Sequence, residues 1–409
     1  MKICQINCIY GIGSTGKIVR DIHQTLMGSG YQSIVIVPEN NLFKSDVGVY
    51  TVSNWLLTYM SAILKRILGM QFDWAYLQTW RIIRILKKEK PDVVHLQCIN
   101  GNNINIYMLL RYLAKNKIKT LYTLHAEFSY TGGCGNTQDC ERWKSGCGRC
   151  PHLGFTGSIF VDGTHRTWKK QNKCYCLFDH NYLHFTAVSP WLASRAEKSS
   201  MLKGHEICPV YNGVDTGVFY YKKTDGGWRN KLGININEKL LLYVTASFFP
   251  HEHNLKGGHF ILELANRFSN SPYKIVVAAN YGDGSKLPGN VIYIGRTKSQ
   301  LDLAELYREA DVTILTSSSE TFGMPVAESL CCGTPVVGFR AGGPESIAIA
   351  EYSDFVEYAD IDALTNTIHK WVIVQKRQEQ ISNQARRIYS KETMTDNYIS
   401  QYKRFEICI

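Results

Sequence analysis

The sequence has no long apolar run. No stretch reaches the ~18 to 20 consecutive apolar residues that a helix needs to cross a bilayer. The chain opens directly on a strand-like pattern at Met1 to Asn7, in place of a secretory leader. We therefore expect a protein that is made and kept in the cytoplasm.

Acidic residues are scarce in the first half of the chain. Residues 1–205 hold 25 Lys and Arg against 12 Asp and Glu, a formal charge of +13, whereas residues 206–409 hold 21 against 23, a charge of −2. This split and the length of 409 residues favour two domains. The basic half predicts an anionic partner, which is nucleic acid, a phosphorylated acceptor or an anionic bilayer. No RNA or DNA motif accompanies the charges, so we expect no nucleic-acid partner.

A nucleoside-triphosphate P-loop is nearly present but lacks its metal ligand. Residues 11–18, GIGSTGKI, follow the first strand pattern and open a helix, yet Ile18 stands where Ser or Thr would hold magnesium. The strand pattern VVHL at 93–96, where a second magnesium ligand would be expected, does not end in an Asp. The glycines, Gly13 and Gly16 among them, instead indicate either close approach of the backbone to a ligand or a plain tight turn.

Strand and helix patterns alternate through both halves, which predicts an α/β protein with parallel, doubly wound sheets. We expect an N-terminal domain over residues 1–214 and a C-terminal domain over residues 229–390. Residues 131–167 have few periodic apolar positions, so an irregular insertion is predicted there.

Four of the thirteen cysteines cluster in this insertion. A disulfide framework is disfavoured in a cytoplasmic protein, which leaves a structural zinc ion or packed thiols. Only one pair has the two-residue gap of a zinc knuckle. The candidate zinc ligands are Cys134, Cys140, Cys147 and Cys150.

Residues 55–68 form a second segment with two interpretations. A helix there places Thr58, Ser61 and Lys65 on one face and apolar residues elsewhere, and basic residues follow at positions 81–88. It is either a helix that lies on a membrane or a core helix with a polar stripe.

Glu320 and Glu328 frame the most informative motif, ETFGMPVAE, which follows an apolar strand pattern and opens a helix at Pro325. Amides that precede a helix N-terminus favour a bound phosphate, and carboxylates accept hydrogen bonds from sugar hydroxyls. The motif therefore predicts a site for a sugar diphosphate; the plain alternative is a strand-end cap and an exposed helix residue. The loop amides concerned are those of Phe322, Gly323 and Met324.

This motif resembles the signature of the family 4 retaining glycosyltransferases, which have the two-domain GT-B fold. The strand YTLHA at 122–126, followed by the cysteine-rich segment, resembles a subset found in bacterial surface-polysaccharide gene clusters of O-antigen, capsule or colanic-acid type. Other matching segments are SPWL at 189–192, YNGVD at 211–215, NLKGG at 254–258, IGR at 294–296, and the glycines Gly338, Gly342 and Gly343.

The resemblance implies two Rossmann-like domains that face each other across a cleft, with residues 391–409 forming a helix that returns to the first domain. It also assigns roles in the donor site. Glu320 holds donor-sugar hydroxyls, Glu328 the ribose, Lys256 the phosphates and Arg296 the base, while His125 lies near the transferring sugar.

The activity implied is a metal-independent hexosyl transfer with retention, from a UDP- or GDP-linked sugar to a lipid-diphosphate-linked glycan. Such an enzyme works in lipopolysaccharide or related surface-polysaccharide assembly, as a peripheral protein on the inner face of the cytoplasmic membrane.

The chain departs from the family pattern at three places. Ala126 replaces an Asp, Gln97 and Asn100 replace two histidines, and the segment FFPHEH at 248–253 lacks an Arg, unless one of its histidines, His251 or His253, substitutes. Two alternatives therefore stay open. One is a nucleotide-sugar-binding protein that has lost transfer activity, and the other is a glycoside phosphorylase of the same fold.

Overall fold

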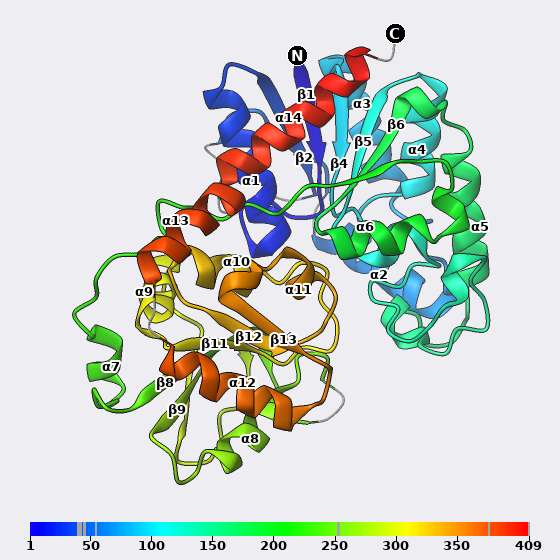
Figure 1. Cartoon of the computed structure of the whole chain (residues 1–409). Coiled ribbons are helices and arrows are strands. Elements are labelled where there is room, and N and C mark those ends of the chain that lie inside the picture. Colours follow the sequence, from blue (N-terminus) through cyan, green and yellow to red (C-terminus); the bar gives the residue numbers. More distant parts are fainter. Residues whose placement is uncertain (39–42, 44–45, 54, 252–253, 375–376, 408–409) are drawn as a thin grey trace. The chain divides into compact units, whose positions relative to one another are not determined.

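The computed structural model describes residues 1–407 apart from residues 39–42, 44–45, 54, 252–253 and 375–376. The chain divides into two compact units (Figure 1). Unit 1 comprises Met1–Gly213 and Met394–Ile409, and unit 2 comprises Val214–Thr393.

Unit 1 is built on a parallel sheet that has seven strands among the described residues, in the order β3-β2-β1-β4-β5-β6-β7. The short, apolar strands are buried on both faces, as expected where helices cover both sides of a parallel sheet. The strands are β1 (Lys2–Ile6), β2 (Gln32–Val37), β3 (Val49–Thr51), β4 (Val93–Leu96), β5 (Lys119–Leu124), β6 (Leu183–Ala187) and β7 (Ile207–Pro209). The helices are α1 (Gly13–Gly28), α2 (Trp55–Leu68), α3 (Tyr76–Glu89), α4 (Ile106–Lys115), α5 (Thr164–Tyr175) and α6 (Pro190–Glu197).

The C-terminal helix α14 (Lys391–Ile407) packs in the core of unit 1. Its apolar residues Met394, Ile399 and Phe405 join residues of α1 and of strands β1, β4 and β5 in one buried cluster. Two of its tyrosines also reach polar partners inside the sheet, described below. A segment almost 400 residues from β1 in sequence thus completes the N-terminal core.

Unit 2 has a second parallel sheet, with six strands among the described residues in the order β10-β9-β8-β11-β12-β13. The strands are β8 (Lys239–Phe248), β9 (Tyr273–Gly282), β10 (Val291–Gly295), β11 (Val312–Leu315), β12 (Val336–Phe339) and β13 (Ser353–Val356). The helices are α7 (Gly227–Lys231), α8 (Gly258–Arg267), α9 (Gln300–Glu309), α10 (Met324–Cys331), α11 (Gly343–Ile347), α12 (Ile361–Ile373) and α13 (Gln378–Tyr389). The predicted doubly wound α/β architecture is confirmed.

Each sheet has one point where the strand order reverses. In unit 1 it lies between β1 and β4, and in unit 2 between β8 and β11. Loops that leave the carboxyl ends of two such strands diverge and open a crevice, which is where open α/β sheets bind their ligands. These two points are therefore the places to examine for a site.

The insertion after β5 is largely irregular, with short 3-10 turns at η1 (Glu127–Tyr130), η2 (Arg142–Lys144) and η3 (Leu153–Thr156). Its regular structure resumes at Thr164, where α5 begins. Elsewhere, Cys331 and Cys332 are buried at the end of α10 and pack as core residues.

Candidate active site

Two charged residues of unit 2 meet at its reversal point. Lys256 lies in the loop after β8 and Glu320 in the loop after β11, and their side chains form an ion pair between Lys256 Nζ and Glu320 Oε1. The hydroxyl of Ser317 donates a second hydrogen bond to the same carboxylate oxygen, at 3.1 Å. Both charged side chains are about one-quarter exposed, so a ligand can reach them.

The two loops are held together by hydrogen bonds to the backbone. The hydroxyl of Thr316 donates to the carbonyl of Gly257 at 2.9 Å, and the amide of Ser318 donates to the carbonyl of Leu255 at 2.9 Å. The phenol of Tyr243, on β8, donates to the carbonyl of Lys256 at 2.5 Å. Lys256 therefore stands on a rigid backbone, although its side chain ends near solvent.

Glycine is required at position 257 for two reasons. Its φ of +69° is one that other L-residues rarely adopt, and a Cβ there would lie 2.1 Å from the carbonyl oxygen of Thr316. Both constraints come from the close approach of the two loops.

We expect Gly257→Ala to destabilise the protein by about 2–4 kcal/mol, because it combines backbone strain with a backbone clash. Urea unfolding of the variant beside Gly289→Ala tests this, since Gly289 has open space around its Cβ position and no positive φ. Equal stability of the two variants would show that the loops are not held as described.

The loop after β11 leads directly into a helix N-terminus. Glu320 is bridged to the loop after β12, where its amide donates to the carbonyl of Ala341 at 2.9 Å and its carbonyl accepts from the amide of Gly343 at 2.8 Å. Gly323, at φ +86°, caps α10, and Pro325 lies in the first turn. Glu320 and the amide-rich start of α10 are thus only a few residues apart, an arrangement that suits a bound anion.

Glu328 lies further along α10. Its carboxylate accepts a hydrogen bond from the phenol of Tyr307, a fully buried residue of α9, at 3.1 Å. Burial, together with the neighbouring Glu328 charge, raises the pKa of Tyr307 well above its usual value, so this phenol remains a donor. Glu328 is therefore oriented by a neighbour that the sequence did not single out.

The remaining donor-site predictions are spread over the same edge of the sheet. Arg296 is exposed and directly follows β10, two strands from β8, and no contact joins it to Lys256 or Glu320 in the described structure. His251 is also exposed, and its ring stacks on Phe249. His253 lies outside the described residues.

In unit 1, His125 ends β5 and belongs to a chain of buried side chains. Its Nε2 is 2.7 Å from Oε1 of Gln97, which follows β4, and Nε2 of Gln97 donates to Oε1 of Gln5, on β1, at 3.0 Å. An amide oxygen can only accept, so Nε2 of the neutral imidazole carries the proton. Burial lowers the pKa of His125 to about 4, which keeps the ring neutral at physiological pH.

The glycine loop after β1 lies at the reversal point of unit 1. Gly11 and Gly13 have φ of +69° and +62°, and the amide of Gly11 donates to the carbonyl of Gly16 at 2.8 Å. Gly16 is buried in the first turn of α1, whereas Gly13 is exposed. The loop is therefore a closed turn that presents backbone at the helix start.

The carboxylate missing at Ala126 is not replaced by the next residue. Glu127 is buried, and its oxygens accept hydrogen bonds from Arg195, Tyr130 and the amide of Thr137 at 2.6–2.8 Å. This carboxylate anchors the insertion to α6 and has no room for a ligand.

His95, on β4, is structural. It is fully buried, with Nδ1 2.7 Å from the phenol of Tyr402 and Nε2 2.7 Å from the hydroxyl of Thr123. Because Tyr402 belongs to α14, the sequence alone offered no sign of this contact. Gln5, Ser317 and Tyr307 were also missed; their only signal was a polar residue at or near a buried element.

The four cysteines of the insertion line one small cavity together with Trp143 and Thr164. Among the residues that the structure describes, no group of three or more His, Cys, Asp or Glu side chains is arranged so that it could hold a metal ion. The zinc interpretation therefore stays a prediction.

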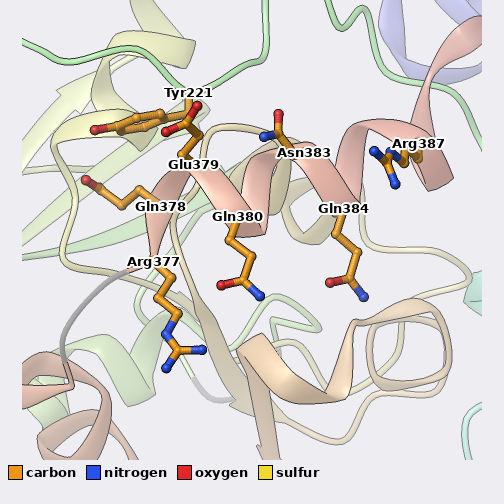
Figure 2. A pocket seen from close by; sticks show the side chains of 8 residues that line it. All are labelled: Tyr221, Arg377, Gln378, Glu379, Gln380, Asn383, Gln384 and Arg387. Atoms are coloured by element: carbon orange, nitrogen blue, oxygen red, sulfur yellow. The ribbon is translucent and has the colours of Figure 1, made fainter.

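A hollow of about 740 Å³ lies along α13. Figure 2 shows its polar side chains spaced along the helix beside Tyr221. Of the described residues that line it, none is a predicted site residue.

None of the helices within the described residues is both long enough and apolar enough to cross a bilayer.

Known proteins resemble this chain over its whole length. WcaC of Escherichia coli K12, named for glycosyl transfer in colanic acid biosynthesis, is 21% identical over 98% of this chain and 100% of its own. A glycosyltransferase from Rickettsia africae superposes with a TM-score of 0.68 at 17% identity, covering 99% of this chain and 98% of its own. Anabaena HepE, solved in complex with UDP, gives a TM-score of 0.67 at 14% identity over 98% and 99% of the two chains.

Two family models divide the chain between them. The model described as Glycosyltransferase Family 4 matches residues 15–218, and the model described as Glycosyl transferases group 1 matches residues 227–388. Their border falls in the segment that links the two sheets. The chain therefore belongs to the family 4 glycosyltransferases and has their GT-B fold.

Proposed function

We propose that this protein is a retaining glycosyltransferase that moves a hexosyl group from a nucleotide-diphosphate donor to a lipid-diphosphate-linked glycan. The observation that carries the proposal is the meeting of Lys256 and Glu320 at the reversal point of unit 2, beside the N-terminus of α10. A cation, a carboxylate and a run of helix amides are the groups that a sugar diphosphate requires.

The ion pair suggests how the donor is received. The diphosphate would replace Glu320 as the anionic partner of Lys256, and the released carboxylate would accept hydrogen bonds from hydroxyls of the donor sugar. Glu328, already oriented by Tyr307, would bind the ribose. Phe322, Gly323 and Met324 would contribute their amides to the diphosphate, and Arg296 would lie toward the base.

Transfer breaks the bond between the anomeric carbon and the diphosphate oxygen and forms a bond from the acceptor oxygen to the same face of the sugar. The acceptor proton passes to a leaving phosphate oxygen. Lys256 and the helix amides would stabilise the negative charge that develops on that phosphate, so the step needs no divalent metal. His125, neutral and held by Gln97, would contact the transferring sugar or the acceptor, near the loop of Gly13 and Gly16.

The relatives support a proposal for the donor base and the pathway. HepE binds UDP and UDP-glucose, and WcaC is named for colanic acid biosynthesis. We therefore propose a UDP-sugar, with GDP-sugar as the alternative, and a role in surface-polysaccharide assembly of colanic-acid, capsule, lipopolysaccharide or O-antigen type. The lipid-linked acceptor places the enzyme at the inner face of the cytoplasmic membrane as a peripheral protein.

A thermal-shift series with UDP, GDP and ADP, in the presence and absence of EDTA, tests the donor site. We expect UDP to raise the melting temperature equally with and without EDTA, because ligands that bind only the native state stabilise it.

The substitution Glu328→Gln keeps a hydrogen-bond acceptor for the phenol of Tyr307 but removes the negative charge of the carboxylate. It should weaken UDP binding about tenfold.

Glu351→Ala is the matched control, because Glu351 is an exposed carboxylate of unit 2 outside the site. If no nucleotide stabilised the protein, the donor site would be wrong. If a UDP-sugar bound but was never consumed with any acceptor or water, the protein would be a binding protein that has lost transfer.

A further inference from the structure

Three segments of unit 1 carry large apolar side chains that are 42–76% exposed. They are α2, the first turns of α3, and the loop at residues 155–161, which begins within η3. The residues are Leu56, Tyr59, Met60, Ile67 and Leu68 on α2, Tyr76, Leu77 and Trp80 on α3, and Phe155, Ile159, Phe160 and Val161 in the loop.

Helix α2 is turned with its polar face inward. Ser61 is buried, and the ammonium of Lys65 lies against Gly157, where burial lowers the pKa of this lysine. By contrast, Tyr59 and Met60 on the other face are 59% and 50% exposed. A surface helix of a globular protein normally does the reverse and buries its apolar stripe. The exposure of Tyr59 and Met60 favours the interpretation of 55–68 as a helix that lies on a membrane.

The loop lies along the C-terminal half of α2 (Figure 1). The amide of Ile159 donates to the carbonyl of Arg66 at 3.2 Å, and the carbonyl of Val161 lies so close to Gly69 that a Cβ there would be 2.2 Å away. The helix and the loop therefore form one continuous surface. The ion pair of Asp73 with Lys170, at 2.6 Å, ties the start of α3 to α5, which follows that loop.

The charge around this surface is predominantly positive. Residues 55–88 contain six Lys and Arg and a single acidic residue, Asp73, which is buried and paired. The exposed cations are Arg66, Arg81, Arg84, Lys87 and Lys88. The guanidinium of Arg84 lies 5.7 Å from the ring of Trp80. Asp162, beside the loop, has its carboxylate oxygens bonded to the amides of Cys150 and Thr164.

We propose that α2, the first turns of α3 and the loop at 155–161 form a docking surface for an anionic lipid bilayer. The apolar and aromatic side chains would enter the boundary between headgroups and acyl chains, while the flanking Arg and Lys contact anionic headgroups. A patch of this size with cations along one border fits a negatively charged, apolar partner. The inference rests on the proposed function only in that the lipid-linked acceptor resides in the same bilayer.

Sedimentation of the full chain with vesicles tests the surface. We expect binding to phosphatidylcholine vesicles that contain phosphatidylglycerol, weaker binding to phosphatidylcholine alone, and loss of binding as salt is raised, because the headgroup attraction is screened. The triple variant Tyr59→Ser/Trp80→Ser/Phe160→Ser should bind at least about tenfold less, since it removes three side chains that would enter the bilayer.

The matched control is Ile236→Ser/Tyr281→Ser in unit 2, where both side chains are more than 70% exposed. The control should bind vesicles like the wild type, and all variants should melt at the same temperature because the replaced side chains are exposed. Equal binding of the triple variant and the control would overturn the proposal. So would a wild-type dimer in solution that the triple variant dissociates, because a second copy would then cover the surface.

The nucleotide response separates this inference from the proposed function. The triple variant should keep the full UDP-induced thermal shift of the wild type, since its substitutions lie in unit 1 and the donor site in unit 2. Vesicle binding without any nucleotide response would retain the docking surface and reject the donor site. A nucleotide response without vesicle binding would retain the donor site and reject the docking surface.

Discussion

Glu320→Ala should lower the rate of sugar transfer by about 10²-fold or more while UDP still binds. The carboxylate is proposed to fix the hydroxyls of the donor sugar, and small errors in the position of a reacting centre cost rates of this order. Binding of the nucleotide should be retained or improved, because Lys256 loses the carboxylate that competes with the diphosphate. Single-turnover transfer and UDP thermal shifts measure the two effects separately.

The stability of this variant should change little. The ion pair between Lys256 and Glu320 is about one-quarter exposed at both ends, and such pairs contribute at most about 1 kcal/mol. Ser317→Ala is the matched control, because it removes only the hydroxyl that donates to Glu320 and should cost far less activity. Full turnover by Glu320→Ala would mean that the site has been assigned to the wrong residues.

Gln97→Leu should destabilise the protein by about 2–5 kcal/mol. The substitution leaves two buried groups without a partner, the Nε2 proton of His125 and the Oε1 atom of Gln5, and each costs about 1–3 kcal/mol. Transfer should fall as well if His125 contacts the sugar, because the ring would lose its hydrogen bond to Gln97. Urea unfolding at pH 7.5, with Gln380→Leu as the control at an exposed position of α13, measures the effect.

The pH dependence distinguishes a positioning role of Gln97 from simple packing. In the native protein the pKa of His125 is about 4, below the ordinary value of 6.5. Between these values the unfolded chain binds a proton that the native protein does not, so the associated stability is complete above pH 6.5 and falls as the pH drops toward 4. The loss from this residue is about 3 kcal/mol.

Gln97→Glu should reverse this trend in part. A carboxylate beside the imidazole favours its charged form and raises the pKa of His125, so less stability is lost below pH 6.5. The acid side of the transfer rate profile should move to higher pH at the same time. An unchanged profile would show that Gln97 only fills space.

The sequence indicated some residues of the candidate site and not others, for physical reasons. The meeting of Lys256 and Glu320 was predictable because both lie in short motifs after strands, and parallel strands bring those motifs to one edge of a sheet. His125 was predictable as a strand-end residue, but its partner Gln97 was read only as a departure from a histidine-rich pattern. The hydrogen bond between Gln97 and His125 joins the ends of the neighbouring strands β4 and β5. The sequence of either segment does not show that these strands are neighbours in the sheet.

By itself, the sequence determined the alternation of strands and helices, the two-sheet architecture and the motifs at the strand ends. These depend on local periodicity and on turn residues, which act over a few positions. Only the tertiary structure decided that His95 is a buried partner of Tyr402 and that Glu127 forms an ion pair with Arg195. It also decided that Tyr59 and Met60 of α2 face outward. Each of these depends on which distant segment packs against the residue, because burial and hydrogen-bond partners are set by contacts across the fold.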